Sequence, residues 1–361
     1  MSPEAVKCPR CSAELAEGAE YCTRCGASEG AADRRRRERN PENLLLQELL
    51  AALRRDLSKD YHVHDMLGRG GMSFVFLAQE RELNRQVAIK VLPLQLMSGG
   101  DFAERFEREG KISASLDHPN IVPIFRVGAS STFLWYTMKR IRGRSLEQII
   151  EERGGLPLSE VLNVVQQVGS ALHYAHRQGV VHRDVKPANV MIEDSGWALV
   201  CDFGIARAFG SVSLTQTGAS IGTPRYMAPE QVEGQPVDGR SDQYSLAILT
   251  WQALTGKLPF DGESVGELIR KHLLEPVPRL TAVRPELPPE VSDAVYRAMS
   301  KKPAERFPDV AAFLRALSGD AAGGAAGARV SAAFANITTP LAASALSDAP
   351  TMRFKPLRRR R

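Results

Sequence analysis

A glycine-rich run between two stretches of alternating apolar and polar residues constrains the fold of this 361-residue chain most strongly. The run, LGRGGMSFV, spans Leu67 to Val75, and the flanking stretches cover residues 61–67 and 74–79. Alternation on both sides of glycines predicts a strand, a tight turn and a second strand. In dinucleotide-binding folds the glycines open a helix instead, and the absence of a G-x-x-x-x-G-K-[ST] sequence disfavours a Walker-type ATPase. We predict a flap whose backbone N–H groups approach phosphate oxygens, because glycine places no side chain in the way.

A charged residue lies inside the next apolar stretch, where Lys90 interrupts residues 87–92. Burying an ammonium group without a partner is costly, so this lysine requires an anion nearby. Residues 101–116 are expected to form a helix that supplies one. Its inward face, at spacings of four and three, holds Phe102, Phe106 and Glu109. An ion pair between Lys90 and Glu109 would present the lysine to phosphates, and the alternative is a purely structural salt bridge.

Three further motifs follow in order: His182 to Asn189 (HRDVKPAN), Asp202-Phe203-Gly204 and Ala228-Pro229-Glu230. With these motifs the chain resembles the eukaryotic-type protein kinase family. It is most similar to the bacterial serine/threonine kinases of that family, through Gly-Gly-Met-Ser in the flap, residues 118–122 and residues 202–207. Six or more motifs in the right order over about 255 residues are far more specific than any single motif.

The resemblance implies a catalytic residue set for phosphoryl transfer, which requires positioning and charge neutralisation. Lys90 would contact the α and β phosphates of ATP, and Glu109 would hold it in place. Asn189 and Asp202 would bind Mg²⁺, or Mn²⁺ in its place. Asp184 would orient or deprotonate the acceptor hydroxyl. Lys186 would lie near the transferred group, and in the family it marks serine/threonine specificity.

The same resemblance assigns a nucleotide pocket. Met138 aligns with the gatekeeper, and Lys139 to Ile141 with the hinge that contacts adenine. Ser73 replaces the third flap glycine, and the hinge edge is basic where the family often has an acidic residue, so details of the adenine pocket stay open. The residues expected to contact nucleotide, besides those of the catalytic set, are Leu67, Gly68, Arg69, Gly70, Gly71, Met72, Ser73, Val75, Ala88, Met138 and Ile141.

An activation segment is expected between the second and third motifs, and Thr215 and Thr217 are its expected phosphorylation sites by resemblance. Ser211, Ser213 and Ser220 are the alternative acceptors. Arg183, next to Asp184, would give a phosphorylated loop a charged partner. Thr223 matches a threonine that docks the substrate. The alternative for this segment is a flexible loop rich in serine and threonine.

Several other residues are expected to be structural. Asp242 resembles the aspartate that caps a central buried helix and steadies the catalytic loop, and Glu230 is expected to pair with Arg306. Trp251 is expected in the core. Cys201 is expected to be a small core residue whose thiol faces the ATP pocket.

Four of the five cysteines lie within residues 8–25, as two Cys-x-x-Cys pairs separated by ten residues. Two-residue spacers let both sulfurs of a pair point at one metal ion, so the pattern predicts a structural zinc ribbon. Iron in the same site, a redox dithiol and a disulfide pair are the alternatives. The expected ligands are Cys8, Cys11, Cys22 and Cys25.

Composition divides the remainder of the chain. Residues 28–60 read as a basic linker followed by an amphipathic helix near Pro41, which packs on the next domain or on a second copy of the chain. Residues 318–361 are rich in Ala and Gly, and their seven Lys/Arg against two Asp equal the formal net charge of +5 of the whole chain. A solvated tail explains this basicity, and an acidic partner, nucleic acid or anionic lipid is the alternative. With no apolar stretch long enough to span a bilayer, we expect a soluble, cytoplasmic protein without a membrane span.

These observations predict an α+β chain with four parts: a zinc ribbon at 1–27, the linker and helix at 28–60, a two-lobed kinase domain at 61–317 and a flexible tail at 318–361. The expected activity is transfer of the ATP γ-phosphoryl group to protein Ser/Thr hydroxyls, with activation by autophosphorylation, in bacterial signalling. A kinase homodimer is a partner that the sequence leaves open. The rival interpretations are a pseudokinase scaffold and a nucleic-acid-binding regulator that uses the ribbon and tail, which would bind in a strongly salt-dependent way.

Overall fold

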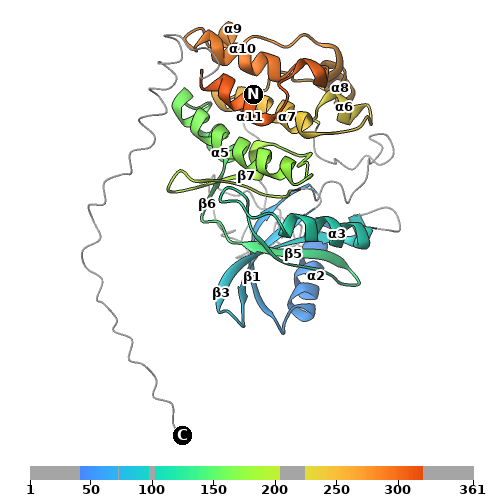
Figure 1. Cartoon of the computed structure of the whole chain (residues 1–361). Helices are drawn as coiled ribbons and strands as arrows, with labels where there is room; N and C mark the ends of the chain where they lie inside the picture. The colour runs from blue at the N-terminus through green and yellow to red at the C-terminus, as the bar shows by residue number, and fades with distance from the viewer. Residues whose placement is uncertain (1–40, 72, 97–101, 204–223, 320–361) are drawn as a thin grey trace, which may run out of the picture. The chain divides into compact units, whose positions relative to one another are not determined.

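A computed structural model of the chain describes residues 41–71, 73–96, 102–203 and 224–319 (Figure 1). These residues fall into two compact units. The described part of the N-terminal unit comprises residues 41–117 and 122–142, with the gaps just given, and the C-terminal unit comprises residues 118–121, 143–203 and 224–319. No helix within the described ranges is both long enough and apolar enough to cross a membrane.

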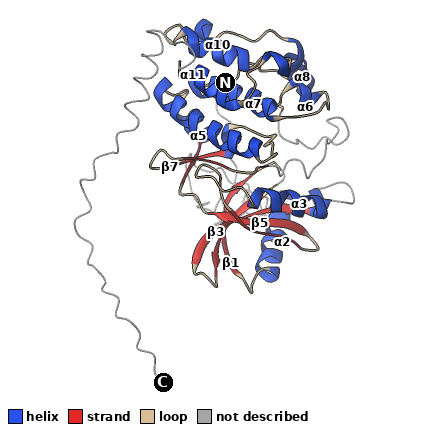
Figure 2. Cartoon of the chain, viewed as in Figure 1, coloured by secondary structure: helices blue, strands red, loops and turns tan. Residues whose placement is uncertain are grey.

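The N-terminal unit is built on a five-stranded antiparallel sheet with strand order β1-β2-β3-β5-β4 (Figure 2). The strands are β1 Tyr61–Arg69, β2 Phe74–Glu80, β3 Arg85–Pro93, β4 Ile124–Ala129 and β5 Phe133–Lys139, and a short 3-10 helix η1, Leu94–Leu96, follows β3. The predicted order of strand, glycine turn and strand is confirmed, because β1 and β2 pair across the turn.

Each face of this sheet carries a helix. Helix α2, Pro41–Asp56, packs on the strands through Leu49, Ala52 and Leu53, which belong to one core cluster with β1, β2, β3 and β5. The other face is covered by α3, Phe102–Ala114, whose Phe106 packs in a second cluster with residues of β3 and β5. For the helix near Pro41 the sequence allowed packing on the next domain or on a second copy of the chain. The structure places this helix, α2, on the sheet of its own chain.

The C-terminal unit is mostly helical, with a small antiparallel sheet of order β6-β7-β8. Its strands are β6 Gly143–Ser145, β7 Val190–Glu193 and β8 Ala198–Val200, and its 3-10 helices are η2 Pro187–Asn189 and η4 Pro303–Glu305. Its α-helices are α4 Leu146–Arg153, α5 Leu158–Arg177, α6 Pro229–Val232, α7 Gly239–Thr255, α8 Val265–Leu274, α9 Leu280–Val283, α10 Pro289–Ala298 and α11 Val310–Leu317.

Helix α7 is the core of this unit, because its side chains are buried around most of its circumference. Trp251 is among them, as expected. The side chain of Asp238 caps the helix by accepting a hydrogen bond from the backbone N–H of Arg240 at 2.8 Å. The prediction that Asp242 caps the helix is therefore wrong. Asp242 lies inside the first turn, where its carboxylate faces the chain around residue 182 instead.

A buried ion pair joins two distant parts of the C-terminal unit, as the sequence predicted. Arg306 donates two hydrogen bonds to the carboxylate of Glu230, at 2.7 and 2.8 Å, and both side chains are almost fully inaccessible to solvent. Burial alone would raise the pKa of Glu230, but the hydrogen bonds and charge of Arg306 more than offset this, and the pKa lies below its usual range. This pair fixes the start of α6 to the loop after η4.

Candidate active site

Four of the residues expected to contact nucleotide share one face of the N-terminal sheet. Lys90 is the cross-strand partner of Val75 on one side, and Ala88 is the partner of Met138 on the other. Because directly opposed residues point to the same side of a sheet, and side chains alternate along β3, these residues form one surface. This is the face that α3 covers, since Leu92 in the same alternation packs against α3.

The predicted partner of Lys90 lies in the same layer. Glu109, one turn after the buried Phe106, is 4% exposed, so its carboxylate points inward as the helical spacing indicated. Arg108 donates a hydrogen bond to Glu109 at 3.2 Å from the solvent side. The side chain of Phe102, the third residue expected on this face, lies outside what the structure describes.

The flap turn is closed by a hydrogen bond from the backbone N–H of Gly70 to the carbonyl of Ser73, at 2.8 Å. A Cβ atom at Gly70 would lie 2.9 Å from Oγ of Ser73, so a larger residue there would require the serine hydroxyl to move. Leu67 is largely exposed on β1, and Ser73 is buried. Met72 lies outside the described residues.

The hinge segment follows β5 directly. The backbone N–H of Lys139 donates to the carbonyl of Pro123 at 3.1 Å, which fixes the end of the strand. Arg140 hydrogen-bonds to Gln86 at the start of β3, and Ile141 is half-buried. The basic edge that the sequence indicated therefore lies at the end of the sheet.

The C-terminal unit brings three of the predicted catalytic residues together. Lys186 lies 2.7 Å from the carboxylate of Asp184. Asn189 donates from Nδ2 to the backbone carbonyl of Asp184 at 2.8 Å and to its carboxylate at 3.0 Å. The Asp184 side chain is 42% exposed, so it can reach an incoming hydroxyl while its neighbours fix its position.

A backbone hydrogen bond connects the segment of Asp202 to the cluster formed by Asp184, Lys186 and Asn189. The N–H of Cys201 donates to the carbonyl of Asn189 at 2.9 Å, which brings the 201–203 segment alongside η2. Phe203 is buried with its ring edge-on to His182, at 4.6 Å between centroids. Asp202 itself has a φ of 65°, in the left-handed region that non-glycine residues rarely adopt.

The donor set fits a hard divalent cation. The amide nitrogen of Asn189 is committed to Asp184, so the atom left to bind a metal is its carbonyl oxygen. Together with a carboxylate oxygen of Asp202, this amide oxygen would be the type of ligand that Mg²⁺ prefers.

A buried aspartate holds the backbone of this segment. The carboxylate of Asp242 accepts hydrogen bonds from the backbone N–H of His182 and of Arg183, both at 2.8 Å, and from Nε2 of His176 at 2.7 Å. Burial by itself would raise the pKa of Asp242, yet the hydrogen bond and charge of His176 and the contacts with His182 keep it below its usual range. The carboxylate therefore stays charged and anchors two successive amides.

Arg183 is held in an unfavourable conformation by contacts on both sides. Its φ is 69°, its N–H is bound by Asp242, and its carbonyl accepts from Nε2 of Gln231 at 3.0 Å. Sequence reasoning missed Gln231 and His176, because neither stands in a motif that we interpreted. The position of Gln231 directly after Ala228-Pro229-Glu230 is the signal that was available.

Cys201 is partly buried, next to Asp202. The predicted zinc ligands and the predicted phosphorylation sites Thr215 and Thr217, together with Thr223, lie outside the described residues. Among the residues that the structure describes, no cluster of three or more His, Cys, Asp or Glu could hold a metal ion.

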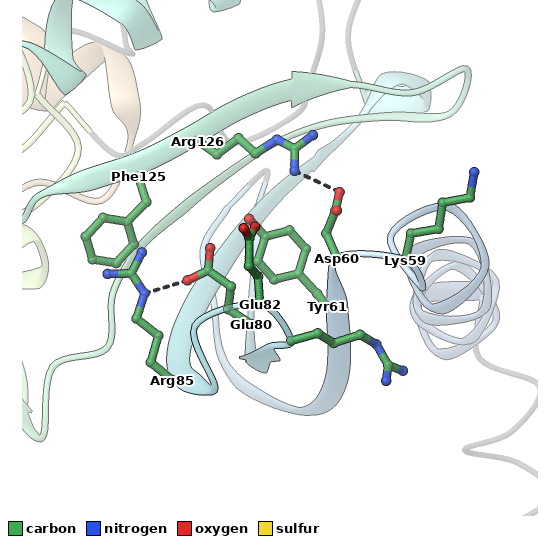
Figure 3. Close-up of a pocket in the computed structure, with 9 residues that line it drawn as sticks. Lys59, Asp60, Tyr61, Glu80, Glu82, Arg85, Phe125 and Arg126 are labelled. Atoms are coloured by element: carbon green, nitrogen blue, oxygen red, sulfur yellow. Dashed lines mark hydrogen bonds and ion pairs between the residues drawn. The ribbon is translucent and has the colours of Figure 1, made fainter. Parts of the chain in front are cut away.

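A pocket of about 570 Å³ on the N-terminal unit is separate from these groups (Figure 3). Its guanidinium groups are engaged, since Arg85 pairs with Glu80 and stacks on Phe125, and Arg126 pairs with Asp60 at 2.7 Å. No residue of the predicted catalytic set lines it. Its lining comprises Lys59, Asp60, Tyr61, Glu80, Arg81, Glu82, Arg85, Phe125 and Arg126.

Comparison with known proteins supports the motif assignment. Residues 61–313 match the protein kinase domain family, and residues 7–28 match a zinc-ribbon domain family. The serine/threonine-protein kinase PrkC of Bacillus subtilis is 38% identical over 251 residues, covering 70% of this chain and 39% of PrkC. PknD of Mycobacterium tuberculosis is 40% identical over 248 residues, covering 68% and 37% respectively. The chain thus spans about two fifths of the length of these curated relatives.

Solved structures agree with the fold. The crystal structure of the Mycobacterium tuberculosis PknI kinase domain superposes with a TM-score of 0.61 at 34% sequence identity, over 72% of this chain and 96% of that one. The predicted two-lobed kinase fold is confirmed by this match and by the sheet and helix content of the two units. Because the domain match covers residues 61–313, well over half of its length, the chain belongs to the protein kinase family.

Proposed function

We propose that this chain is an active serine/threonine protein kinase that transfers the γ-phosphoryl group of ATP to hydroxyl groups of protein substrates. The observation that carries the proposal is the constellation of Asp184, Lys186 and Asn189, with Asp202 attached to it through the backbone. A scaffold that only binds partners would not need to retain this full set, nor Lys90 on the sheet.

Each residue has a role that its surroundings favour. Asp184 accepts or orients the proton of the acceptor hydroxyl, because its carboxylate is exposed and fixed by two neighbours. Lys186, in contact with Asp184, supplies positive charge next to the acceptor, where negative charge develops during transfer. Lys90 neutralises phosphate charge from the N-terminal unit.

ATP and a divalent cation are the cofactors that this family requires. Asn189 and Asp202 would hold Mg²⁺, or Mn²⁺, which supplies neutralisation of the phosphate charge when it is bound. The four cysteines at 8–25 would hold structural Zn²⁺, in keeping with the zinc-ribbon match. Autophosphorylation of Thr215 or Thr217, answered by Arg183, would activate the enzyme. A homodimer and an acidic partner for the basic tail stay predictions.

The test compares the parent chain with Asp202→Asn after incubation with Mg²⁺ and ATP, with phosphate mapped by intact mass and peptide analysis. Asp194→Asn serves as the control, because Asp194 is exposed on the turn between β7 and β8. We expect phosphate on the parent and the control but not on Asp202→Asn. Kinase activity would be refuted, and a scaffold favoured, if the parent stays unmodified and does not phosphorylate a supplied protein at Ser or Thr. The same must hold for a variant of this chain in which Thr215 and Thr217 are both replaced by glutamate.

A further inference from the structure

Gln231 connects two segments of the C-terminal unit that lie 48 residues apart in the sequence. Its side-chain oxygen accepts a hydrogen bond from the backbone N–H of Ala228 at 3.0 Å, and its Nε2 donates to the backbone carbonyl of Arg183, also at 3.0 Å. Because a backbone N–H only donates and a carbonyl only accepts, the two contacts together determine which end of the amide faces each segment. The proposed catalytic steps give this side chain no role.

The carbonyl that Gln231 binds belongs to the peptide between Arg183 and Asp184. The N–H of the same peptide donates to Nδ1 of His182 at 3.2 Å. A peptide group is planar, so its carbonyl, its N–H and the Cα atom of Asp184 turn together. With a partner at each end, this plane cannot rotate without losing a hydrogen bond, and the direction in which Asp184 projects is fixed with it.

The backbone at Arg183 needs contacts of this kind. Its φ of 69° lies in the left-handed region, where a side chain makes the conformation unfavourable. The peptide on the N-terminal side of Arg183 is held by Asp242, which accepts from the N–H of Arg183 at 2.8 Å. Gln231 holds the peptide on the other side. A strained residue persists only when its surroundings hold it, so loss of the amide donor would allow the Arg183–Asp184 peptide to relax.

Gln231 itself is a firmly anchored donor. It is the third residue of the short helix α6, and its backbone N–H donates to the carbonyl of Ala228 at 3.0 Å. The preceding residue, Glu230, is held by the buried pair with Arg306 and by Ser241, whose hydroxyl donates to it at 2.5 Å. The backbone of α6 is therefore fixed to the core, and the amide of Gln231 is presented from a rigid base.

We propose that Gln231 is a positioning residue, which holds the Arg183–Asp184 peptide through its amide N–H and so keeps the Asp184 carboxylate in line with the acceptor hydroxyl. The proposal rests on the proposed kinase function, because it depends on the catalytic role of Asp184. Its effect should fall on kcat, since a small misplacement of a catalytic group slows the chemical step more than it weakens binding of ATP. It also makes α6 a support of the catalytic segment.

The variant Gln231→Glu separates the two functions of the amide. A carboxylate of the same size can still accept from the N–H of Ala228, and glutamate serves as well as glutamine at this position of a helix. It has no proton to donate to the Arg183 carbonyl. Gln231→Met removes both hydrogen bonds with a side chain of similar length. Gln235→Glu is the control for added charge, because Gln235 is exposed four residues later.

The assay measures steady-state kinetics of the full chain with a protein substrate of the parent enzyme, at equal phosphate content by intact mass. We expect kcat to fall about tenfold or more in both Gln231→Glu and Gln231→Met, the equivalent of one hydrogen bond, with KM for ATP changed less than about twofold. Gln235→Glu should match the parent.

A capping role alone would give a different pattern. Gln231→Met would then lose thermal stability and activity together, whereas Gln231→Glu would keep both, because it keeps the cap. A kcat of Gln231→Glu equal to that of the parent would therefore overturn the proposal.

A second measurement does not depend on activity. In HNCO spectra of the full chain, the resonance of the Arg183 carbonyl carbon is observed through the N–H of Asp184, and it responds to a hydrogen bond on the carbonyl. We expect it to move in Gln231→Met and to stay in place in Gln235→Glu. An unchanged resonance in Gln231→Met would overturn the proposal even in an active kinase. If the parent phosphorylates nothing, the proposed function fails, and this resonance still decides whether the Gln231 amide holds the peptide.

Discussion

The buried imidazole of His272 makes a prediction about acid stability that is independent of catalysis. Burial lowers its pKa in the folded protein to about 4, against about 6.5 for a histidine in an unfolded chain. Below pH 6.5 the unfolded chain therefore binds a proton that the native imidazole does not. Stability from this residue is complete above pH 6.5 and is lost as the pH falls towards 4.

The magnitude follows from the two pKa values. At pH 5 the unfolded histidine is almost fully protonated and the folded one almost fully neutral, which costs about 2 kcal/mol of unfolding free energy, whereas at pH 7 the cost is about 0.2 kcal/mol. In His272→Gln this contribution is absent, because an amide does not titrate. The parent should therefore lose about 2 kcal/mol more than the variant between pH 7 and pH 5.

Urea unfolding at 25 °C, followed by tryptophan fluorescence at pH 7 and pH 5, measures the difference. The pKa values of Glu230 and Asp242 are also lowered, so acidification reduces their contribution to the unfolding free energy in both proteins. This contribution therefore cancels when the parent and the variant are compared. Lys301, with a pKa lowered by burial to about 8, stays charged over this range. Equal pH dependence in parent and variant would refute the conclusion that the native imidazole resists protonation.

Three further predictions concern stability and are measured by the same unfolding assay. Arg306→Met should lower the free energy of unfolding by about 3–5 kcal/mol, because it leaves the Glu230 carboxylate buried and unpaired. The double variant with Glu230→Met should recover most of this loss. A double variant as unstable as the single one would contradict this. Asp238→Ala should cost about 1 kcal/mol through loss of the α7 cap, and an unchanged midpoint would mean that the cap contributes nothing. Gly256→Ala should cost more than Gly234→Ala, because both glycines have a φ near +70° but only at Gly256 would a Cβ meet a backbone oxygen, at 2.3 Å; similar losses would show that strain alone decides.

Local patterns in the sequence were sufficient for those parts of the fold that depend on neighbouring residues. The alternation around the flap and the helical spacing of Phe106 and Glu109 depend on neighbouring residues, and both expectations match the structure. The contact of Lys186 with Asp184 also joins residues close in sequence, although the motif predicted only that Lys186 lies near the transferred group. Contacts of this type leave a periodic or motif signature that can be interpreted without coordinates.

The expectations that failed or were missed depend on contacts between distant residues. For Asp242 only the capping role failed, because Asp238 performs it, whereas the expected support of the catalytic loop is confirmed by the hydrogen bonds with His182 and Arg183. The surface that α2 covers was undecided for the same reason, since amphipathicity shows that a helix face is buried but not against what. The environment of His272 combines residues from three separate helices and loops, which only the folded chain brings together.

Because of α2, the packed core of the N-terminal unit extends beyond the residues that match the family. The family match begins at Tyr61, yet Leu49, Leu53 and Leu57 are buried against the sheet that follows. A shortened protein that starts at Tyr61 would uncover the apolar side of β1, β2 and β3 that these leucines shield, at roughly 1.5–3 kcal/mol for each leucine removed. Such a protein would carry every residue of the predicted catalytic set and still expose an apolar surface. The sheet of the N-terminal unit therefore includes in its core a helix that begins at Pro41, about twenty residues before the family match.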